Sequence, residues 1–244
     1  IEYIVIENNS QKKETFAYYE KLQAENPKVK VVFWEREFNY SAINNYGVGF
    51  AKGEYLLFLN NDTEIINPDC IEELLGYCMR DDVGIVGARL YYEDDTIQHV
   101  GVIIGLGGVA GHTFVGEPKD SLGYFGRIVT AQDYSAVTAA CLMTKRKVFE
   151  KVNGFEEKLA VAFNDVDFCL KVREAGYLVV YNPYAELHHY ESKSRGLEDT
   201  EEKVLRFQGE IRTFQYRWKE ILNEGDPYYS PNLTLDKTDF SLRI

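Results

Sequence analysis

The chain has 244 residues, of which 45% are hydrophobic and 14% aromatic, so it can bury a core of domain size. Its 39 acidic and 27 basic residues give a formal charge of -12, and no Lys/Arg-rich stripe is present that could neutralise a phosphate backbone. A nucleic-acid partner is therefore not expected. A field of this sign would repel an anionic ligand unless a bound cation intervened.

The four cysteines lie among apolar neighbours without a C-x-x-C pair, which favours buried thiols in a reducing compartment over zinc ligands or disulfides. No run approaches the roughly 18 apolar residues of a membrane span, and no leader with charged, apolar and small-residue regions is present. We therefore expect a cytoplasmic protein. The chain starts without Met, on what reads as the middle of a strand, and we expect it to be a fragment.

Strand-like and helix-like segments alternate in the first third of the chain, which predicts parallel strands joined by crossover helices. The expected strands are 1–6, 29–34 and 55–59, and the expected helices are 12–25, Ser41 to about Gly53, and the Asn67-Pro68 cap to about Met79.

The pattern changes after Gly84, where strand-like segments 85–92 and 98–104 and a glycine-rich aromatic loop to about residue 130 predict an antiparallel insertion or a lobe that faces substrate. Strands over 136–144 and 177–190 and helices over 164–175 and 200–222 complete an α/β domain at 1–224, with a C-terminal tail at 225–244.

The segment from Gly105 to Ala110 reads G-x-G-x-x-A after a strand, which is the form of a dinucleotide-binding fingerprint. Such a motif needs a helix whose N-terminus meets the pyrophosphate, and the segment from Gly111 to Pro118 is a poor helix. We therefore interpret these glycines as a flexible or ligand-facing loop.

Three strand-like runs end abruptly in polar side chains. In open α/β sheets, ligands bind beyond the carboxyl ends of the strands, so these residues are candidates for a site that holds a divalent cation and phosphate oxygens. The alternative is that Asn, Asp and Ser simply form turns. The polar ends are Glu7-Asn8-Asn9-Ser10, Asn60-Asn61-Asp62-Thr63 and His188-His189-Tyr190.

Asp165 lies at the start of a predicted helix and shares an apolar face with Phe168, Cys169 and Val172, at i, i+3, i+4 and i+7, whereas Asp167 points elsewhere. A carboxylate in this position can cap the helix or interact with its dipole. It can equally accept a proton from a substrate hydroxyl. The spacing alone does not separate these two interpretations.

Three motifs in this order resemble the family 2 glycosyltransferases of the GT-A fold, and the resemblance spans nearly the whole chain. They are Asn45 to Asp62, Asn153-Gly-Phe-Glu-Glu157 and Asn164 to Tyr177. The chain is most similar to bacterial enzymes that build cell-surface polysaccharides of the rhamnan and O-antigen types. The resemblance implies a mixed, mostly parallel central sheet flanked by helices.

The resemblance also implies roles for the strand-end residues. Asp62 matches the principal metal-side carboxylate, with Asn60 in place of the first Asp of the usual Asp-x-Asp motif and Asn61 beside the donor diphosphate. The expected metal is Mn2+ or Mg2+. Glu7 and Asn8 match positions near the nucleobase, where Asn8 replaces a frequent Asp.

The resemblance further implies that Asp165 is the catalytic base, with Asn164 in place of the usual Glu. The family has a histidine near the metal after its last core strand. Strand alternation favours His189 over His188 for this position, because His189 shares the apolar face with Leu187. A packed or solvent-facing histidine is the alternative.

Further contacts are expected from loops. Arg195, within Ser192 to Gly196, could hold the diphosphate. Acceptor recognition is expected in the segment from Gln98 to Arg127, and an ordinary loop is the alternative for each of its residues. The candidate acceptor contacts are His112, Tyr124, Arg127 and Asn164, with His99 and Phe125 as further polar or aromatic residues of the segment. Family members normally have a strand, a nucleotide loop and a helix before the segment that starts here, so we expect the sheet to lack a central member.

The expected activity is inverting transfer of a sugar from a nucleotide-diphosphate sugar to a hydroxyl of a saccharide or lipid-linked glycan, in the cytoplasm or at the inner face of the bacterial membrane. Asp165 would be the base, and a metal on Asp62 and His189 would offset charge on the leaving diphosphate. The alternatives are a non-catalytic glycan-binding or scaffold module and a nucleotidyltransferase.

Overall fold

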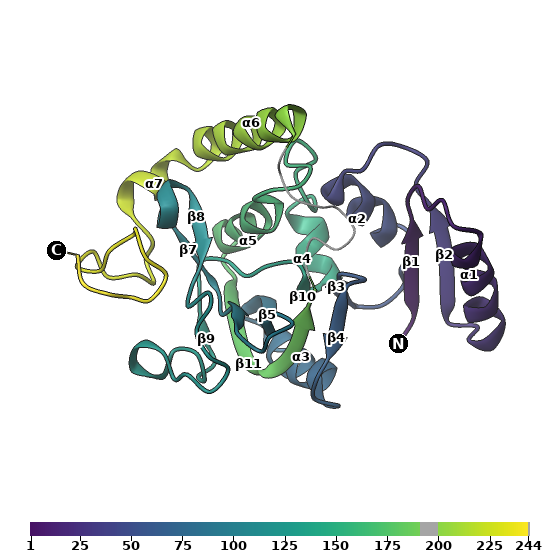
Figure 1. Cartoon of the computed structure of the whole chain (residues 1–244), viewed down its shortest axis with the longest axis horizontal. Helices are drawn as coiled ribbons and strands as arrows, with labels where there is room; N and C mark the ends of the chain where they lie inside the picture. The colour runs from purple at the N-terminus through teal and green to yellow at the C-terminus, as the bar shows by residue number, and fades with distance from the viewer. Residues whose placement is uncertain (191–199, 244) are drawn as a thin grey trace.

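The computed structural model describes residues 1–190 and 200–243, which form an α/β fold (Figure 1). The strands are β1 (Tyr3–Glu7), β2 (Val29–Phe33), β3 (Tyr55–Leu59), β4 (Thr63–Ile65), β5 (Val83–Tyr91), β6 (Ile97–His99), β7 (Val102–Ile104), β8 (Ala110–His112), β9 (Gln132–Asp133), β10 (Cys141–Lys145) and β11 (Leu178–His189). The α-helices are α1 (Lys13–Glu25), α2 (Tyr40–Val48), α3 (Cys70–Cys78), α4 (Arg146–Lys151), α5 (Asn164–Glu174), α6 (Glu201–Arg217) and α7 (Lys219–Glu224).

A mixed sheet with the strand order β3-β10-β5-β11-β4 is the centre of the fold. β5 and β11 are parallel, and β10 is antiparallel to both of its neighbours, β3 and β5. β3, β5 and β11 therefore all end at the same edge of the sheet, and β10 begins there. The predicted mixed sheet with flanking helices is confirmed. The expectation that this sheet is mostly parallel is not met, because β5–β11 is its one parallel pairing among the described strands and the other pairings are antiparallel.

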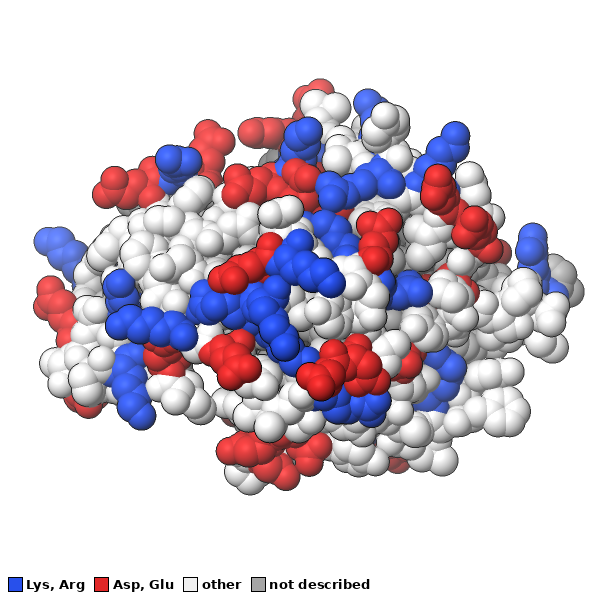
Figure 2. Space-filling model, turned by 180° about the vertical axis from the view of Figure 1, so that it is seen from behind, with Lys and Arg blue, Asp and Glu red and all other residues white. Residues whose placement is uncertain are grey.

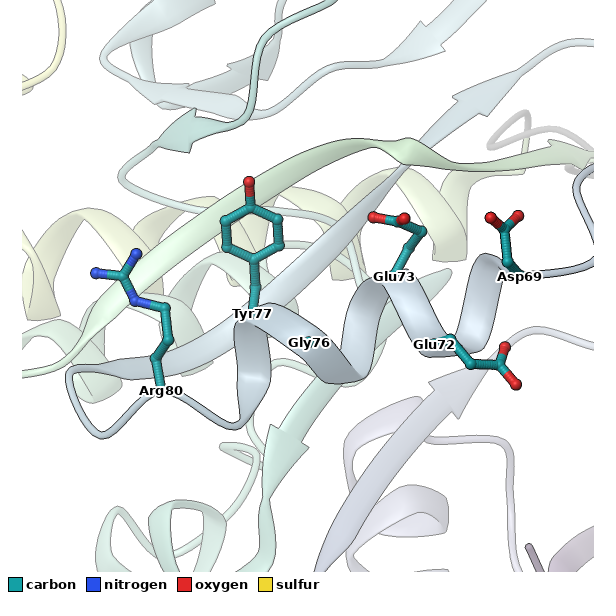
Figure 3. Close-up of a pocket in the computed structure, with 6 residues that line it drawn as sticks. All are labelled: Asp69, Glu72, Glu73, Gly76, Tyr77 and Arg80. Carbon is teal, nitrogen blue, oxygen red and sulfur yellow. The ribbon is translucent and has the colours of Figure 1, made fainter.

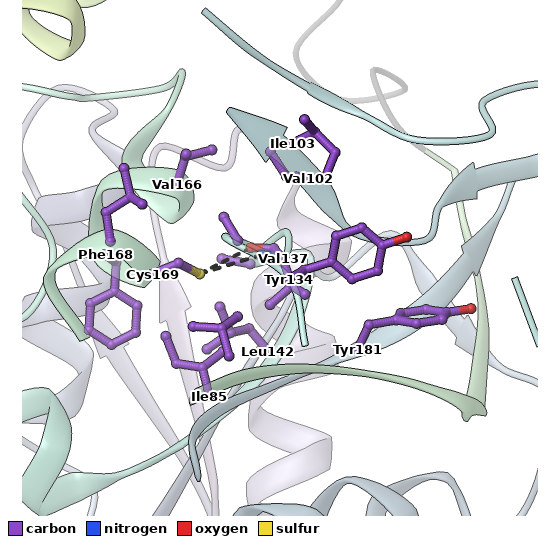
Figure 4. Packing of buried hydrophobic residues seen from close by; sticks show 14 of the residues in the cluster. Ile85, Val102, Ile103, Tyr134, Val137, Leu142, Val166, Phe168, Cys169 and Tyr181 are labelled. Carbon is purple, nitrogen blue, oxygen red and sulfur yellow. Dashed lines mark hydrogen bonds between the residues drawn. The ribbon is translucent and has the colours of Figure 1, made fainter. Parts of the chain in front are cut away.

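Helices cover both faces of this sheet. On one face, Leu74 and Cys78 of α3 pack with Val86 and Leu187 of the sheet. On the other face, Phe168 and Cys169 of α5 pack in the larger core, which Figure 4 shows around Val137 and Leu142. Cys169 and Val137 are also joined by sulfur hydrogen bonds of 3.5 Å. All four cysteines are free and buried.

β1 and β2 form a separate parallel pair, which lies with α1 at the right of Figure 1. Among the described residues, β1 pairs only with β2, and β3 pairs only with β10. The expectation that the sheet lacks a central member stays a prediction. The Glu2 carboxylate links the two parts because it accepts hydrogen bonds from the backbone amides of Lys52 and Gly53, at 2.5 and 2.8 Å.

Two predicted helix starts are wrong. α2 begins at Tyr40 with Asn39 as the N-cap, because the Asn39 side chain accepts a hydrogen bond from Ala42 N at 2.9 Å. Ser41, the predicted cap, instead donates to Leu159 O. The predicted cap Asn67 lies before α3 and bonds to β11, where it donates to Tyr184 O and accepts from Glu186 N. In both cases the side chain that the local pattern predicts to cap the helix bonds instead to a residue distant in the sequence.

Three other predicted elements differ from the structure. The expected strand 136–144 is shortened to β10, since Ala136 forms only an isolated bridge with Val102 and a turn at residues 139–140 precedes the strand. The expected strand 98–104 is split into β6 and β7 at Gly101, whose φ of 111° suits glycine. The expected helix 200–222 is divided into α6 and α7 at Trp218, and the short strand β4 was not expected.

Residues 226–242 pack against the β7–β8 hairpin, at the left of Figure 1. Gly107 N donates to Leu235 O at 2.9 Å, and Phe114 N donates to Thr238 O at 2.8 Å. The ring of Phe240 is stacked on that of Phe114 at 4.9 Å. The division at residue 224 stays a prediction, but the segment beyond it contributes to the core.

Among residues 1–190 and 200–243, no helix is long and apolar enough to cross a membrane. On the face seen in Figure 2, Lys and Arg side chains lie among Asp and Glu side chains.

We expect Gly87→Ala to destabilise the fold by about 1–3 kcal/mol, because the new methyl group would lie 2.5 Å from Val137 Cβ in the core. The matched control is Gly76→Ala in α3, whose methyl group would meet nothing within 4 Å and should stabilise the fold by roughly 0.4–1 kcal/mol. Urea unfolding of both variants measures the difference. Equal free energies of unfolding would contradict the packing described around Val137.

Phe240→Ala should cost about 3–5 kcal/mol, because the ring is only 3% exposed and packs on the hairpin. The control is Phe125→Ala, which removes a ring that is 89% exposed and should change stability by no more than about 0.5 kcal/mol. Both residues have positive φ values, so backbone strain is similar in the two variants. Thermal melting compares them, and a Phe240→Ala protein as stable as wild type would show that residues 226–242 do not stabilise the domain.

Candidate functional site

The ends of β3 and β11 bring Asn60, Asp62 and His189 together. β11 continues along β4, where His189 is paired with Thr63, so the histidine lies beside the turn that follows β3. His189 Nε2 is 3.3 Å from Asp62 Oδ1 and 3.2 Å from Asn60 Nδ2. The alternation of β11 was predicted correctly, since Ala185, Leu187 and His189 are all buried.

The neighbouring His188 faces the surface side, where its Nε2 is 2.9 Å from Asp95 Oδ1. Asn61 is exposed in the turn between Asn60 and Asp62. Arg195 and the rest of the predicted diphosphate loop lie outside the described residues. Their roles stay predictions.

Gln98 of β6 completes the surroundings of His189, and sequence reasoning did not identify it. Its Oε1 is 2.7 Å from His189 Nδ1, and its Nε2 donates to His189 O at 3.0 Å. Gln98 is 2% exposed. The sequence signal is weak, since Gln98 and His99 are consecutive polar residues between the apolar Ile97 and Val100.

The backbone of Ala139 and Ala140 connects this cluster to Asp165. Ala140 O accepts a hydrogen bond from Asn60 N at 2.9 Å, and Ala139 N donates to Asp165 Oδ2 at 3.2 Å. Ala139 O accepts from the Tyr40 hydroxyl at 2.8 Å. The turn before β10 therefore contacts both the segment that carries Asp62 and the helix that carries Asp165.

Tyr40 lies near both carboxylates. Burial raises the pKa of Tyr40, and the charges of Asp165 and, more weakly, Asp62 raise it further. Its hydroxyl is therefore protonated at neutral pH and remains a donor to Ala139. His99 lies on the other side of the same turn, where its Nε2 accepts from Thr138 N at 3.3 Å. Burial holds the pKa of His99 well below its usual value, so its ring is neutral.

Asp165 is half-buried in the first turn of α5 and accepts from Val166 N at 2.8 Å in addition to Ala139 N. The N-cap position belongs to Phe163, which has a φ of 61° and offers no side-chain oxygen. Asp165 thus satisfies one first-turn amide without being the N-cap. Its carboxylate is fixed in orientation by two backbone donors.

Asp167 does point away from Asp165, but it is fully buried. Its Oδ1 accepts from Trp218 Nε1 and Arg217 Nε, each at 2.9 Å, so it joins α5 to the end of α6. Burial raises the pKa of Asp167, against the opposing effects of Lys171, Trp218 and Arg217. The sequence pattern missed this contact because its partners, Arg217 and Trp218, lie 50 and 51 positions further along the chain.

The side chains of Glu7 and Asn8 join the end of β1 to neighbouring segments by hydrogen bonds. The Glu7 carboxylate accepts from Ser10 N at 2.6 Å, Ser10 Oγ at 2.7 Å and the Tyr19 hydroxyl at 2.7 Å. Burial raises the pKa of Glu7, but these three hydrogen bonds outweigh it and hold the pKa below its usual value. Asn8 donates to Trp34 O and Arg36 O, at 2.9 and 3.0 Å. Both side chains therefore shape this loop, and their contact with a nucleobase stays a prediction.

The predicted acceptor residues do not form one cluster. His112 Nδ1 is 3.1 Å from Gln98 O, and its ring lies 4.7 Å from that of His99, close to the His189 cluster. Tyr124 and Arg127 instead pack on Phe240, at 5.7 and 4.8 Å. Asn164 is 4% exposed and donates to Val161 O at 3.0 Å. His112 has the position that best suits a contact near the site.

Asp62 and His189 offer one carboxylate oxygen and one imidazole nitrogen that face each other. In the described part of the chain, no group of three or more His, Cys, Asp or Glu residues could hold a metal by itself. A set of two protein ligands suits Mg2+ or Mn2+ that takes its other ligands from water and phosphate oxygens. The residues present therefore fit a cation shared with an anionic ligand.

A hollow along α3 is separate from this site. Figure 3 shows its lining residues, among which Asp69, Glu73 and Tyr77 project on one side of the helix. None of the predicted site residues lines it.

Comparison with known proteins gives one family match and two long alignments. The model of glycosyl transferase family 2 matches residues 1–152. The chain is 48% identical over 242 residues to the uncharacterized protein y4gI of Sinorhizobium fredii, which covers 99% of the chain and 26% of that protein. It is 38% identical over 244 residues to the O-antigen biosynthesis protein RfbC of Myxococcus xanthus, covering 99% of the chain and 18% of that protein. The chain thus spans about a quarter or less of the length of these relatives.

The fold is similar to that of a solved glycosyltransferase. The crystal structure of GalNAc-T7 with UDP, GalNAc and Mn2+ has a TM-score of 0.68 and 14% sequence identity, covering 91% of the chain and 44% of that protein. At this identity the similarity establishes the fold, which is GT-A, and nothing further.

Asp62→Ala should weaken Mn2+ binding in the presence of UDP or GDP by at least about tenfold, since even changes to groups that support a metal ligand cost 10–100-fold. Glu64→Ala, which removes an exposed carboxylate of β4 and changes the net charge equally, should retain wild-type affinity. Calorimetric titration of the full-length protein measures both. Equal affinities in the two variants would exclude Asp62 as a ligand.

Proposed function

Because the chain belongs to glycosyl transferase family 2, we propose that its site transfers a sugar from a nucleotide-diphosphate sugar to a hydroxyl of a growing glycan, with inversion at the anomeric carbon. The observation that supports this best is the turn at Ala139 and Ala140, whose backbone contacts Asp165 on one side and Asn60 on the other. Through this turn, a candidate base and a candidate cation site share one edge of the sheet.

Asp165 is the proposed catalytic base. The acceptor oxygen attacks the anomeric carbon while the bond from that carbon to the diphosphate oxygen breaks, and the hydroxyl proton passes to the Asp165 carboxylate. A single base on the face opposite the leaving group gives inversion without a covalent intermediate. The hydrogen bonds from Ala139 N and Val166 N hold the carboxylate in one orientation, which reduces the rearrangement needed for proton transfer.

Asp62 and His189 are the proposed ligands of a divalent cation, which when bound would offset the negative charge on the leaving diphosphate. The chain has a formal charge of -12, so a site without a cation would repel such a donor. Asn61 and Arg195 are proposed to contact the diphosphate, and Glu7 and Asn8 to shape the nucleobase end.

The acceptor is proposed to be a saccharide or lipid-linked glycan of a bacterial cell surface, in keeping with the name of the Myxococcus relative. His112 is the proposed acceptor contact beside the His189 cluster, Asn164 is the candidate that adjoins Asp165, and Tyr124 and Arg127, which pack on Phe240, are retained as further candidates. We propose that the reaction takes place in the cytoplasm or at the inner face of the membrane.

The proposed activity is tested by incubating the full-length protein with Mn2+ and a panel of nucleotide sugars. Release of nucleoside diphosphate is expected and supports sugar transfer. Release of pyrophosphate would indicate a nucleotidyltransferase. Neither product, in a folded protein that binds the donor, would indicate a non-catalytic glycan-binding or scaffold module.

Asp165→Asn should lower turnover by roughly 10²–10⁴-fold with little change in donor affinity, because the amide keeps the size of the side chain but cannot accept the proton. Stability should change by no more than about 1 kcal/mol, because the amide oxygen can still accept a backbone hydrogen bond. Asp81→Asn, at an exposed position, is the matched control and should retain wild-type turnover. Steady-state kinetics and melting curves measure the effects, and a stable Asp165→Asn protein with wild-type turnover would remove Asp165 from the mechanism.

A further inference from the structure

The side chain of Gln98 contacts His189 through both of its polar ends. Its Oε1 lies 2.7 Å from His189 Nδ1, and its Nε2 donates to the carbonyl oxygen of the same residue at 3.0 Å. Gln98 is 2% exposed and His189 is 8% exposed, so water has little access to these contacts. The two polar ends of one buried amide therefore both contact the same buried histidine.

This arrangement fixes which end of the amide faces the ring. A carbonyl oxygen can only accept, so the group that faces His189 O must be the NH2 end of Gln98. The carbonyl end then faces His189 Nδ1, which must carry a hydrogen in order to donate to it. The reverse orientation would place two acceptors against each other at the backbone carbonyl.

A hydrogen on Nδ1 determines the state of the other ring nitrogen of His189, Nε2. In the neutral ring, a hydrogen on Nδ1 leaves Nε2 with a lone pair. That nitrogen lies 3.2 Å from the Asn60 amide nitrogen, which can donate to it, and 3.3 Å from Asp62 Oδ1, which cannot. An imidazole lone pair and a carboxylate oxygen thus face each other, an arrangement that a cation between them would stabilise.

We propose that Gln98 is a positioning residue, which holds His189 in the Nδ1–H tautomer and so presents the Nε2 lone pair to a divalent cation shared with Asp62. Histidine ligands commonly donate their second ring N–H to a partner that sets tautomer and orientation. The inference rests on the proposed function, because that function supplies the cation. Gln98 itself contacts neither the cation nor the sugar donor in this assignment.

The backbone around Gln98 is hydrogen-bonded on two sides. The Gln98 side chain can therefore hold the His189 ring in one orientation. β6 pairs with β5 through Leu90 with His99 and Tyr91 with Ile97. On the other side, Ile97 N donates to Glu117 O at 2.7 Å, and Gly116 N donates to Ile97 O at 2.8 Å. Gln98 therefore belongs to the sheet rather than to a loop that could move away from His189.

The tautomer is read directly from the ¹⁵N chemical shifts of the His189 ring, measured without metal on the full-length protein at a pH high enough for the ring to be neutral. Wild type should show the neutral Nδ1–H pattern. Gln98→Met removes both polar contacts at similar volume, so the Nε2–H form, which can donate to Asp62, should become populated. Gln98→Glu keeps an acceptor for Nδ1–H but loses the donor to His189 O, so it should keep the hydrogen on Nδ1 while holding the ring less firmly than wild type. An Nε2–H pattern of the neutral ring in wild type would overturn the inference, whether or not Gln98→Met folds.

The second readout is the affinity for Mn2+ in the presence of UDP or GDP, measured by electron paramagnetic resonance. Gln98→Met should weaken it by about 10–100-fold, and Gln98→Glu, which keeps the acceptor for Nδ1–H, should weaken it less. The control is Gln132→Met, which removes a half-buried amide that donates to Arg127 O and Thr130 O and should leave both readouts unchanged.

A folded Gln98→Met protein with the wild-type tautomer and Mn2+ affinity would overturn the inference. Failure of wild type to bind Mn2+ with either nucleotide would overturn the cation part of this inference and of the proposed function together. Failure of sugar transfer with Mn2+ binding and tautomer intact would count against the proposed function alone.

Discussion

The backbone of Ala139 and Ala140 is the contact on which the candidate site depends. Its three hydrogen bonds, to Asn60 N, Asp165 Oδ2 and the Tyr40 hydroxyl, join the end of β3, the start of α5 and the start of α2. This contact exists because β10 is antiparallel to β3 and β5, so the turn before it returns to the edge where those strands end. A parallel strand in this place would bring its other end to the site.

The two proposed chemical roles are assigned to carboxylates in different surroundings. Asp165 is held by two backbone donors at a helix start, which favours a single orientation for proton transfer. Asp62 lies beside a histidine whose ring is oriented by Gln98. In a chain of net charge -12, a cation bound at Asp62 and His189 would also reverse the local field that repels an anionic donor.

Much of the fold could be predicted from sequence because its signals are local. The apolar runs of β3, β5 and β11, the helical spacing of α5 and the strand alternation that separates His189 from His188 depend on neighbouring residues only. Errors arose where a distant partner competed for a side chain. Ser41 bonds to Leu159, and Asn67 bonds to residues of β11, so neither is the cap that its local pattern predicts.

The sequence by itself determined that the chain is an α/β glycosyl transferase family 2 domain with polar residues at its strand ends. Family motifs and the alternation of strand-like and helix-like segments depend only on residues that are close together in the chain. Only the tertiary structure decided which of these residues meet. It brought Gln98 to His189 across 91 positions, buried Asp167 against Trp218, and placed Tyr124 and Arg127 on Phe240 rather than beside Asp62. The physical reason is that strand order and crossover direction set these contacts, and neither can be read from the spacing of residues along the chain.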